Sequence, residues 1–386
     1  MPPGFKGGAV MKLNIKSRFG TDRIKCFASI FFAALLCRWA VFLFAWNASG
    51  TDSGFFQAVY DAFVKAGDTP HYIEIAKNGY TAAGENSNLI VFFPLYPLLM
   101  RIFALFSQNY FASGLFVSNV CTGLGACVLY ELMRIDLPEE DAALGLALFL
   151  LFPYSFFTSA VYTEGLFLLL SASSLYCMRK RRWGGAFAFG LTCALTRTQG
   201  TVLAFAFAYE MLIDFSKTKR LDKKAAAAVF APLLGYFIYL LINKLVYGDW
   251  FIYLDFQADE PWYNKAQWIG ENIKQHYDMA MQYKDGLAMY IYFPQLILFF
   301  AAAALLLYGL KNGAPSSYII YGGAYTAVTY LHGWQISGGR YMSLCLPLFI
   351  IAASAKSKTA KYTALAASAM FYAAMSSLWF SGYAIM

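Results

Sequence analysis

A polar stretch that follows the first apolar run carries the residues best suited to chemistry. Residues 52–80 hold Asp68, His71 and Tyr72 within a few positions of one another. Because Thr69-Pro70 follows Asp68, one interpretation of this carboxylate is the N-cap of a helix that begins with proline. The other is a catalytic carboxylate, and local chemistry alone favours the cap. His71 has no second histidine nearby, and a histidine on its own is more often an interfacial hydrogen-bonding residue than a general base.

Further ionisable groups stand at the ends of apolar segments. Glu164 begins one segment, Arg197 closes another and Arg340 begins a third. Two arginines on the same side of a membrane as Asp68 would suit a phosphate clamp, but an arginine at a helix end also snorkels to the interface. Three roles are open for Glu164: orienting an acceptor, holding a divalent cation with Asp68, or capping its helix.

Composition places these residues in a membrane protein. Of 386 residues, 59% are hydrophobic and only 13% are charged, too few to cover a water-facing surface. Apolar runs of about twenty residues recur from residue 27 onward, which predicts an all-α polytopic membrane protein. The net charge of +8 comes from short basic clusters between these runs, which is typical of membrane topology and not of a nucleic-acid partner.

No group of Cys, His or carboxylate residues has a recognisable metal-ligand spacing. The sequence therefore requires no cofactor and assigns no metal ligand, and a divalent cation remains an option. The first apolar run, 27–46, is longer than the apolar core of a signal peptide, so we expect it to be retained as the first span.

The basic clusters determine the predicted topology. The positive-inside rule assigns all of them to the cytoplasm, and they lie at 1–26, 179–182, 217–224, 311 and 356–361. Twelve apolar segments are candidate spans: 27–46, 89–106, 110–133, 142–157, 164–178, 184–198, 200–215, 225–247, 288–310, 317–332, 340–356 and 361–383.

Twelve crossings would leave the later basic clusters on the outer side, so one segment before residue 179 does not cross. Segment 89–106 contains Pro94, Pro97 and Arg101. We interpret it as an interfacial or half-inserted helix on the outer side, which leaves about eleven spans and a cytoplasmic N-terminus.

The predicted organisation is one domain, 1–386, with two long outer loops. The first loop, 47–109, should contain two amphipathic helices at about 53–66 and 70–78. The second loop, 247–287, is acidic and aromatic, and it either covers an acceptor or forms an interfacial belt. Its residues of interest are Trp250, Tyr253, Asp255, Asp259, Glu260, Trp262, Tyr263, Trp268 and His276.

Three blocks of residues carry a resemblance to a known family. The first comprises Asp68, His71, Tyr72, Ile75, Ala76, Gly79 and Tyr80, followed by Phe92, Phe93, Pro94, Tyr96 and Pro97. The second comprises residues 158–167 and 195–200, and the third is Gly339-Arg340-Tyr341. In this order they resemble the GPI mannosyltransferase II (PIG-V type) family of the GT-C superfamily. Family members usually have Trp where this chain has Gly67, and often Ser-Asn where it has Thr198-Gln199.

The resemblance implies a GT-C-type helical bundle. The compact chain, which has no endoplasmic-reticulum retrieval tail, leads us to expect a prokaryotic member. The resemblance also implies mannose transfer from a polyprenyl-phosphate donor to a hydroxyl of a lipid-linked or glycan acceptor, by single displacement with inversion. It makes Asp68 and Glu164 the expected catalytic residues. The expected substrate-binding residues are His71, Tyr72, Arg197, Gln199, Arg340 and Tyr341. The expected location is the bacterial plasma membrane, or the endoplasmic reticulum in a eukaryote, with the site on the outer face among membrane lipids.

Two other functions remain open, a transporter (flippase) for lipid-linked sugars and a non-catalytic subunit of a glycosyltransferase complex. A transporter is disfavoured because we find no inverted repeat and expect no charged residue at mid-span, the intramembrane charges gathering at the outer ends. A non-catalytic subunit is disfavoured because the chain retains the acidic residue.

Overall fold

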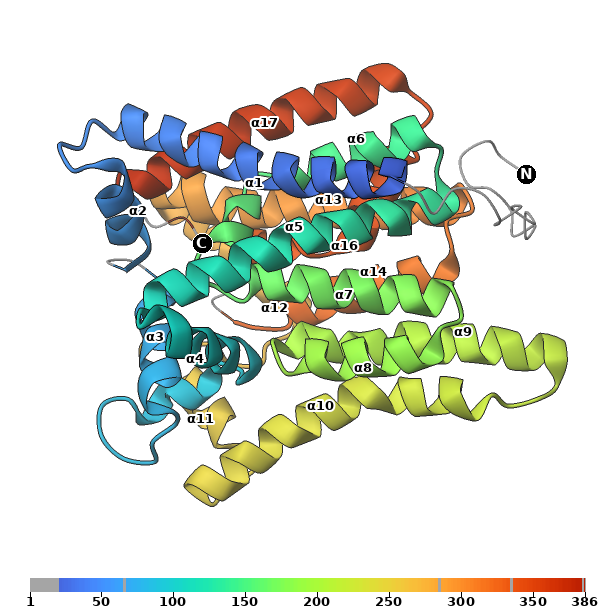
Figure 1. Ribbon diagram of the computed structural model, residues 1–386, viewed down its shortest axis with the longest axis horizontal. Helices are drawn as coiled ribbons and strands as arrows, with labels where there is room; N and C mark the ends of the chain where they lie inside the picture. The colour runs from blue at the N-terminus through green and yellow to red at the C-terminus, as the bar shows by residue number, and fades with distance from the viewer. Residues whose placement is uncertain (1–20, 65–66, 284–285, 334–335, 384, 386) are drawn as a thin grey trace.

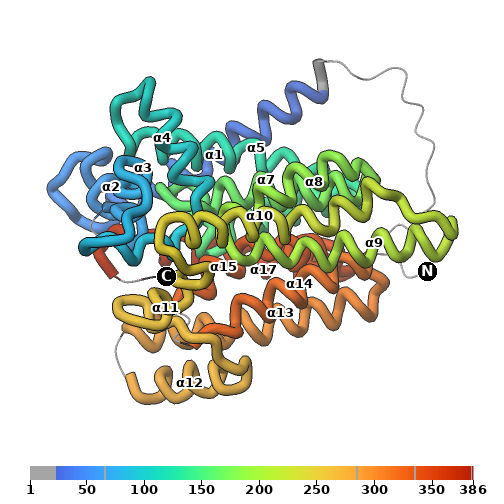
Figure 2. Tube along the Cα trace, turned by 90° about the horizontal axis from the view of Figure 1, so that it is seen from below, coloured from blue at the N-terminus to red at the C-terminus, as the bar shows by residue number. Residues whose placement is uncertain are grey.

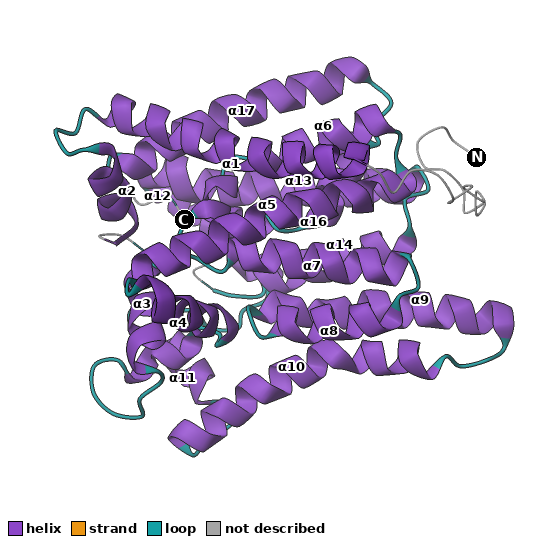
Figure 3. Ribbon diagram, viewed as in Figure 1, coloured by secondary structure: helices purple, strands orange, loops and turns teal. Residues whose placement is uncertain are grey.

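The computed structural model describes residues 21–64, 67–283, 286–333, 336–383 and 385 (Figure 1). These residues form helices and loops, and the one pairing of extended backbone among them is an isolated bridge between Ala266 and His332 (Figure 3). The architecture confirms the predicted all-α polytopic fold. The basic residues Lys12, Lys16 and Arg18 lie outside the described residues.

Five helices in the described part of the chain are long and apolar enough to cross a membrane. A helix of 25 residues such as α10 extends about 37 Å, which exceeds the hydrocarbon thickness of about 30 Å. Each long helix coincides with a predicted span: α1 (Thr21–Ser49), α5 (Tyr110–Asp136), α10 (Lys223–Tyr247), α13 (Phe293–Lys311), which a π-helical turn η4 (Ala288–Tyr292) precedes, and α17 (Lys358–Phe380).

Shorter helices fill the rest of the bundle. Three of them match predicted spans closely: α7 (Glu164–Arg179), α9 (Leu203–Thr218) and α14 (Ser316–Tyr330). Three predictions of a continuous helix were wrong. Segment 142–157 is helical only in α6 (Glu139–Leu150), segment 184–198 only in α8 (Trp183–Ala194), and segment 340–356 is split into α15 (Gly338–Met342) and α16 (Leu346–Ala353).

Local chemistry explains these interruptions. Pro153 lies just beyond α6 and leads into the 3-10 helix η2 (Ser155–Ser159). Pro347 lies at the start of α16, where a backbone N–H would have no partner within the helix, so proline costs no hydrogen bond there. After α8, the carbonyl of Leu195 accepts a hydrogen bond from the backbone N–H of Leu95 at 3.1 Å. Non-helical backbone at membrane depth is tolerated where protein surrounds it or where it lines a cavity.

Helix α4 (Leu95–Ser107) replaces the predicted segment 89–106, after the 3-10 helix η1 (Ser87–Val91). Its 13 residues extend only about 20 Å, which is less than the hydrocarbon thickness of about 30 Å. It packs against the first turns of α5, because the Tyr96 hydroxyl reaches the Gly114 carbonyl at 3.1 Å and the Phe103 and Phe116 rings lie 5.0 Å apart. This arrangement supports a helix that enters and leaves on one side.

Four other short helices belong to the two loops. The first loop, 47–109, contains α2 (Phe55–Val64) and α3 (Thr69–Asn78), which confirms the two predicted helices. The second loop, 247–287, contains α11 (Ile252–Ala258) and α12 (Ile269–Gln282). Figure 2 shows α12 beside α13 at the edge of the bundle.

The bundle has two chemically distinct ends. Figure 1 shows α2, α3, α4 and α11 gathered at one end, which we call the site end. The connections α7–α8, α9–α10, α13–α14 and α16–α17 lie at the other, where α1 begins, and they carry the basic clusters that the sequence assigned to one side. The helices are therefore connected as the positive-inside rule requires.

Arg38 corrects the expectation that no charge lies at mid-span. It sits inside α1, is fully buried, and donates to the Leu150 carbonyl at the end of α6 and to the Thr158 hydroxyl at 3.3 Å. An unpaired helix-end carbonyl in a membrane needs a donor, and Arg38 supplies one. This arginine stabilises the interruption between α6 and α7 and does not line the cavity described below.

Candidate active site

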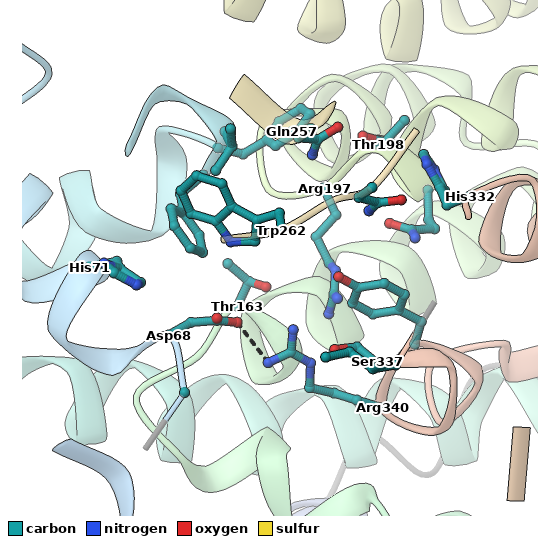
Figure 4. A pocket seen from close by; sticks show the side chains of 18 of the residues that line it. Asp68, His71, Thr163, Arg197, Thr198, Gln257, Trp262, His332, Ser337 and Arg340 are labelled. Carbon is teal, nitrogen blue, oxygen red and sulfur yellow. Dashed lines mark hydrogen bonds and ion pairs between the residues drawn. The ribbon is translucent and has the colours of Figure 1, made fainter. Parts of the chain in front are cut away.

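A cavity of about 420 Å³ lies at the site end (Figure 4). The first loop, the residues before α7, the residues after α8, the second loop and the segment leading into α15 all contribute to its wall. Its lining residues are Gly67, Asp68, His71, Tyr72, Val91, Phe92, Phe93, Thr163, Thr196, Arg197, Thr198, Gln199, Gln257, Pro261, Trp262, Tyr263, Asn264, His332, Ile336, Ser337, Arg340 and Tyr341. Seven of the eight predicted site residues are therefore brought together.

Asp68 occupies the residue before α3, but its side chain makes no capping hydrogen bond. Instead its Oδ2 accepts a charge-assisted hydrogen bond from Nη1 of Arg340 at 2.7 Å (Figure 4). The capping interpretation was wrong, because the carboxylate turns away from the helix and into the cavity. Its other oxygen, Oδ1, accepts no hydrogen bond from the described residues.

The backbone around Asp68 is held by Tyr162. The Asp68 N–H donates to the Tyr162 hydroxyl oxygen at 2.9 Å. Gly67 has a φ of +78°, and a Cβ at this position would stand 1.9 Å from the same hydroxyl. Both conditions require glycine, so a Trp here is incompatible with this loop conformation.

Arg340 lies between two carboxylates. Its Nη1 pairs with Asp68 and its Nε lies 3.2 Å from Oε1 of Glu164, while its side chain is only 6% exposed. The guanidinium also lies over the Tyr162 ring, 5.0 Å from its centre. A buried arginine with two acidic partners and an aromatic face is fixed in position, which distinguishes it from an arginine that merely snorkels.

Arg197 reaches the same carboxylate from the other side. Its Nη1 donates to Oε1 of Glu164 at 2.7 Å, and its guanidinium stacks on the Tyr341 ring at 4.3 Å. The residue is extended, with φ −162° and ψ 151°, because α8 ends at Ala194. Gln199 follows in the 3-10 helix η3 (Thr198–Val202) and also lines the cavity.

Glu164 is the one predicted site residue that does not line the cavity. It begins α7, its side chain is 1% exposed, and it lies behind the two arginines. Gly165 permits this placement, because a Cβ there would stand 2.5 Å from the carbonyl oxygens of Ser118 and Thr158. Glu164 therefore contacts Arg197 and Arg340 from the side opposite the cavity.

His71 and Tyr72 lie on α3 and face the cavity. The His71 ring stacks on Phe92 with a centroid distance of 5.2 Å, and burial lowers the pKa of this imidazole although Asp68 opposes the change. Burial, with Asp68 and Glu164 adding to it, raises the pKa of the Tyr72 phenol far above its ordinary range. Both side chains are therefore neutral hydrogen-bonding groups at neutral pH.

Some residues of the second loop suit the role of covering an acceptor, and others suit an interfacial belt. Trp262 and Tyr263 line the cavity. Trp268 is 69% exposed, and Trp250 stacks on Phe237 at 5.6 Å, so both tryptophans face away from the cavity. The remaining residues of interest, Tyr253, Asp255, Asp259, Glu260 and His276, are not among the lining residues.

Several lining residues were not anticipated. His332, Ser337 and Asn264 reach the cavity from loops, and Gln257 reaches it from α11. Thr163 precedes α7 and belongs to the 158–167 block, but it was not among the expected site residues. His332 is the last residue of the predicted span 317–332. The only sequence feature that could have drawn attention to it is that the chain has just three histidines. Burial lowers the pKa of its imidazole.

The described residues contain no cluster of three or more His, Cys, Asp or Glu side chains suited to a metal ion. Within the candidate site, the positive charge between Asp68 and Glu164 is the Arg340 guanidinium.

Comparison with known proteins gives one family. The model of the family described as mannosyltransferase (PIG-V) matches residues 55–308, about two thirds of the chain. The match includes Asp68, His71, Tyr72, Glu164 and the 195–200 block, and it ends before Arg340 and Tyr341. No curated protein matches the chain. With the helices of a multi-pass membrane protein, this match shows that the chain belongs to the PIG-V mannosyltransferase family and is a membrane mannosyltransferase.

Proposed function

We propose that this enzyme transfers mannose from a polyprenyl-phosphate donor to an acceptor hydroxyl by a single displacement with inversion. The observation that carries the proposal is the chain of ion pairs from Asp68 through Arg340 and Glu164 to Arg197, three of whose four members face one cavity. This arrangement suits the reaction, because a carboxylate can accept the proton of the acceptor hydroxyl and two guanidiniums can stabilise the polyprenyl phosphate that leaves.

The arginines serve the leaving group. The donor is a phosphodiester, and its phosphate gains negative charge as the bond to the sugar breaks. Because Glu164 fixes both Arg197 and Arg340 before the substrate binds, their charge is already directed at the place where negative charge develops. We assign Glu164 the role of a positioning residue, since it contacts the arginines and not the cavity.

Asp68 serves the acceptor. Its Oδ2 is bonded to Arg340, and its Oδ1 is available for a proton. In the proposed step the acceptor oxygen attacks the anomeric carbon, the bond from that carbon to the phosphate oxygen breaks, and the electron pair leaves with the phosphate. The acceptor proton passes to Oδ1 of Asp68. One attack from the face opposite the phosphate inverts the anomeric centre.

An apolar cavity of about 210 Å³ supports a lipid donor. It lies among α6, α13, α16 and α17, and its lining includes Met342, the second residue after Arg340. A polyprenyl chain attached to a phosphate at Arg340 would find an apolar path next to its headgroup. The other lining residues are Leu148, Phe152, Leu298, Ala301, Ala302, Leu305, Leu348, Phe349, Ala352, Ala364 and Ser368.

The orientation follows from charge. The basic connections lie opposite the site end, and the positive-inside rule assigns basic connections to the cytoplasm. The proposed reaction therefore takes place on the outer face of the membrane, which is the bacterial plasma membrane in our proposal, or the endoplasmic reticulum in a eukaryote.

Transfer of radiolabelled mannose from polyprenyl-phosphate mannose, measured with the purified chain alone in detergent, tests the proposal. Labelled glycoside in the acceptor supports it. Movement of labelled lipid across vesicles without transfer would instead indicate a transporter, and transfer only when other subunits are added would indicate a non-catalytic subunit. The mid-span charge expected of a transporter is present as Arg38, but it is bonded to helix-end groups and lies away from the cavity.

A further inference from the structure

We propose that the wall of the cavity formed by Gln257, Trp262, Asn264 and His332, here called the neutral wall, is a binding site for an uncharged pyranose ring. The inference rests on the proposed function and extends it by naming the part of the site that holds a sugar. Figure 4 shows Gln257, Trp262 and His332 across the cavity from Asp68 and Arg340.

The cavity separates charge from neutral polarity. Among its described lining residues, Asp68, Arg197 and Arg340 are the only Asp, Glu, Lys or Arg side chains. The neutral wall offers amides, an imidazole whose pKa burial lowers, and an indole. Neutral amides bind hydroxyl groups through both donors and acceptors, whereas a phosphate is better served by the arginines.

The neutral wall is held in place by backbone pairing. The Asn264 N–H donates to the Gln257 carbonyl at 2.6 Å, which closes this part of the second loop on itself. The segment is then joined to the residues around His332, because the Gln267 N–H donates to the Leu331 carbonyl and the Gly333 N–H donates to the Lys265 carbonyl, both at 2.7 Å. A preformed wall loses little conformational entropy on binding.

Asn264 supplies the most specific indication of a ligand. Its side-chain oxygen, Oδ1, is buried and accepts no hydrogen bond from the described residues. A buried acceptor without a donor costs free energy, and a hydroxyl donor from a sugar would satisfy it. A hydroxyl binds here better than an anion, because a carbonyl oxygen repels negative charge.

Trp262 supplies a flat apolar surface for the ring. Its indole packs edge-to-face against Phe92 at 5.9 Å and His71 at 6.3 Å, so its orientation is fixed by the first loop. A pyranose has an apolar face of C–H groups and a rim of hydroxyls. An aromatic ring next to neutral amides therefore matches a sugar better than it matches a phosphate or a lipid tail.

Binding measurements with three probes test the inference: polyprenyl phosphate without sugar, polyprenyl-phosphate mannose, and methyl α-mannoside added after saturation with polyprenyl phosphate. For Trp262→Ala we expect unchanged affinity for polyprenyl phosphate and a roughly tenfold loss of sugar-dependent affinity. Trp262→Phe should recover part of the loss, and Asn264→Ala should show a smaller one. The matched control is Trp268→Ala, which removes an exposed tryptophan of the same loop.

The probes distinguish the two sources of the ring. If Trp262→Ala no longer binds polyprenyl-phosphate mannose more tightly than polyprenyl phosphate, the neutral wall holds the donor's mannose. If that preference remains but binding of methyl α-mannoside is lost, the neutral wall holds a ring of the acceptor. Wild-type binding of both sugar probes to Trp262→Ala and Asn264→Ala would overturn the inference. Failure of the wild-type protein to bind polyprenyl phosphate would instead overturn the proposed donor.

Discussion

The substitution Asp68→Asn separates the proposed chemistry from the structural role of this residue. Asparagine has the same size and still offers an oxygen to Nη1 of Arg340, but it has no charge and cannot accept the acceptor's proton. Since the side chain of Asp68 does not cap α3, the helix loses nothing. The change acts on the ion pair and on the proton transfer.

The expected loss of stability is modest. The ion pair measures 2.7 Å, with the two side chains 6% and 18% exposed, and breaking a charged hydrogen bond of this kind costs about 1–3 kcal/mol. Glu164 remains 3.2 Å from Nε of Arg340 and keeps the guanidinium compensated. We therefore expect the variant to fold, with a lowered melting temperature.

The expected loss of turnover is much larger. A positioned general base contributes about 10²–10⁴-fold, equivalent to about 2.7–5.5 kcal/mol of barrier. The KM for the donor should stay the same or fall, because removing the negative charge leaves Arg340 freer to bind phosphate. A group that only positioned Arg340 would produce the opposite pattern, with a raised donor KM and a nearly normal kcat.

The assay is mannose transfer by purified, monodisperse protein over a range of donor concentrations, with thermal unfolding measured on the same preparation. Asp52→Asn is the matched control, because Asp52 is an exposed residue of the first loop outside the cavity. A fully active Asp68→Asn enzyme would refute the assignment of Asp68 as the base.

Four further predictions follow from the same geometry. Reporters fused near residues 87 and 108 should both report the outer side, because α4 is short and lies with α2, α3 and α11 at the site end; opposite sides would require a new topology. Arg197→Ala and Arg340→Ala should raise the donor KM at least tenfold and Arg→Lys should restore part of it, whereas unchanged donor kinetics would make both arginines anchors. Glu164→Gln should lower the melting temperature more than Asp68→Asn, because it leaves two buried arginines without their shared partner; equal melting temperatures would contradict this role. Transfer should continue in EDTA, and activity that vanishes and returns with added Mg²⁺ or Mn²⁺ would show that a cation takes part.

The sequence by itself determined the all-α membrane fold, and it predicted seven of the residues that line the candidate site. Lengths of apolar runs set the long helices, since a run of about twenty residues has no other stable form in lipid. The prolines of 89–106 and the positions of the basic clusters predicted a helix that stays on one side, and the structure shows that this helix, α4, has only 13 residues. The spacing around Asp68 and the blocks near Glu164 and Arg197 predicted the candidate residues, because each of them lies where an apolar segment begins or ends.

Only the tertiary structure decided what these residues contact. Asp68 and Arg340 are separated by 272 positions, and no local pattern could show that their side chains meet or that the carboxylate prefers this partner to the end of α3. Packing of α7 against α5 placed Glu164 behind the arginines. In the second loop, Trp262 and Trp268 lie six positions apart, yet only Trp262 lines the cavity and Trp268 is 69% exposed. Helices form from local apolar periodicity, whereas the contacts of a site depend on how separate segments pack together in three dimensions.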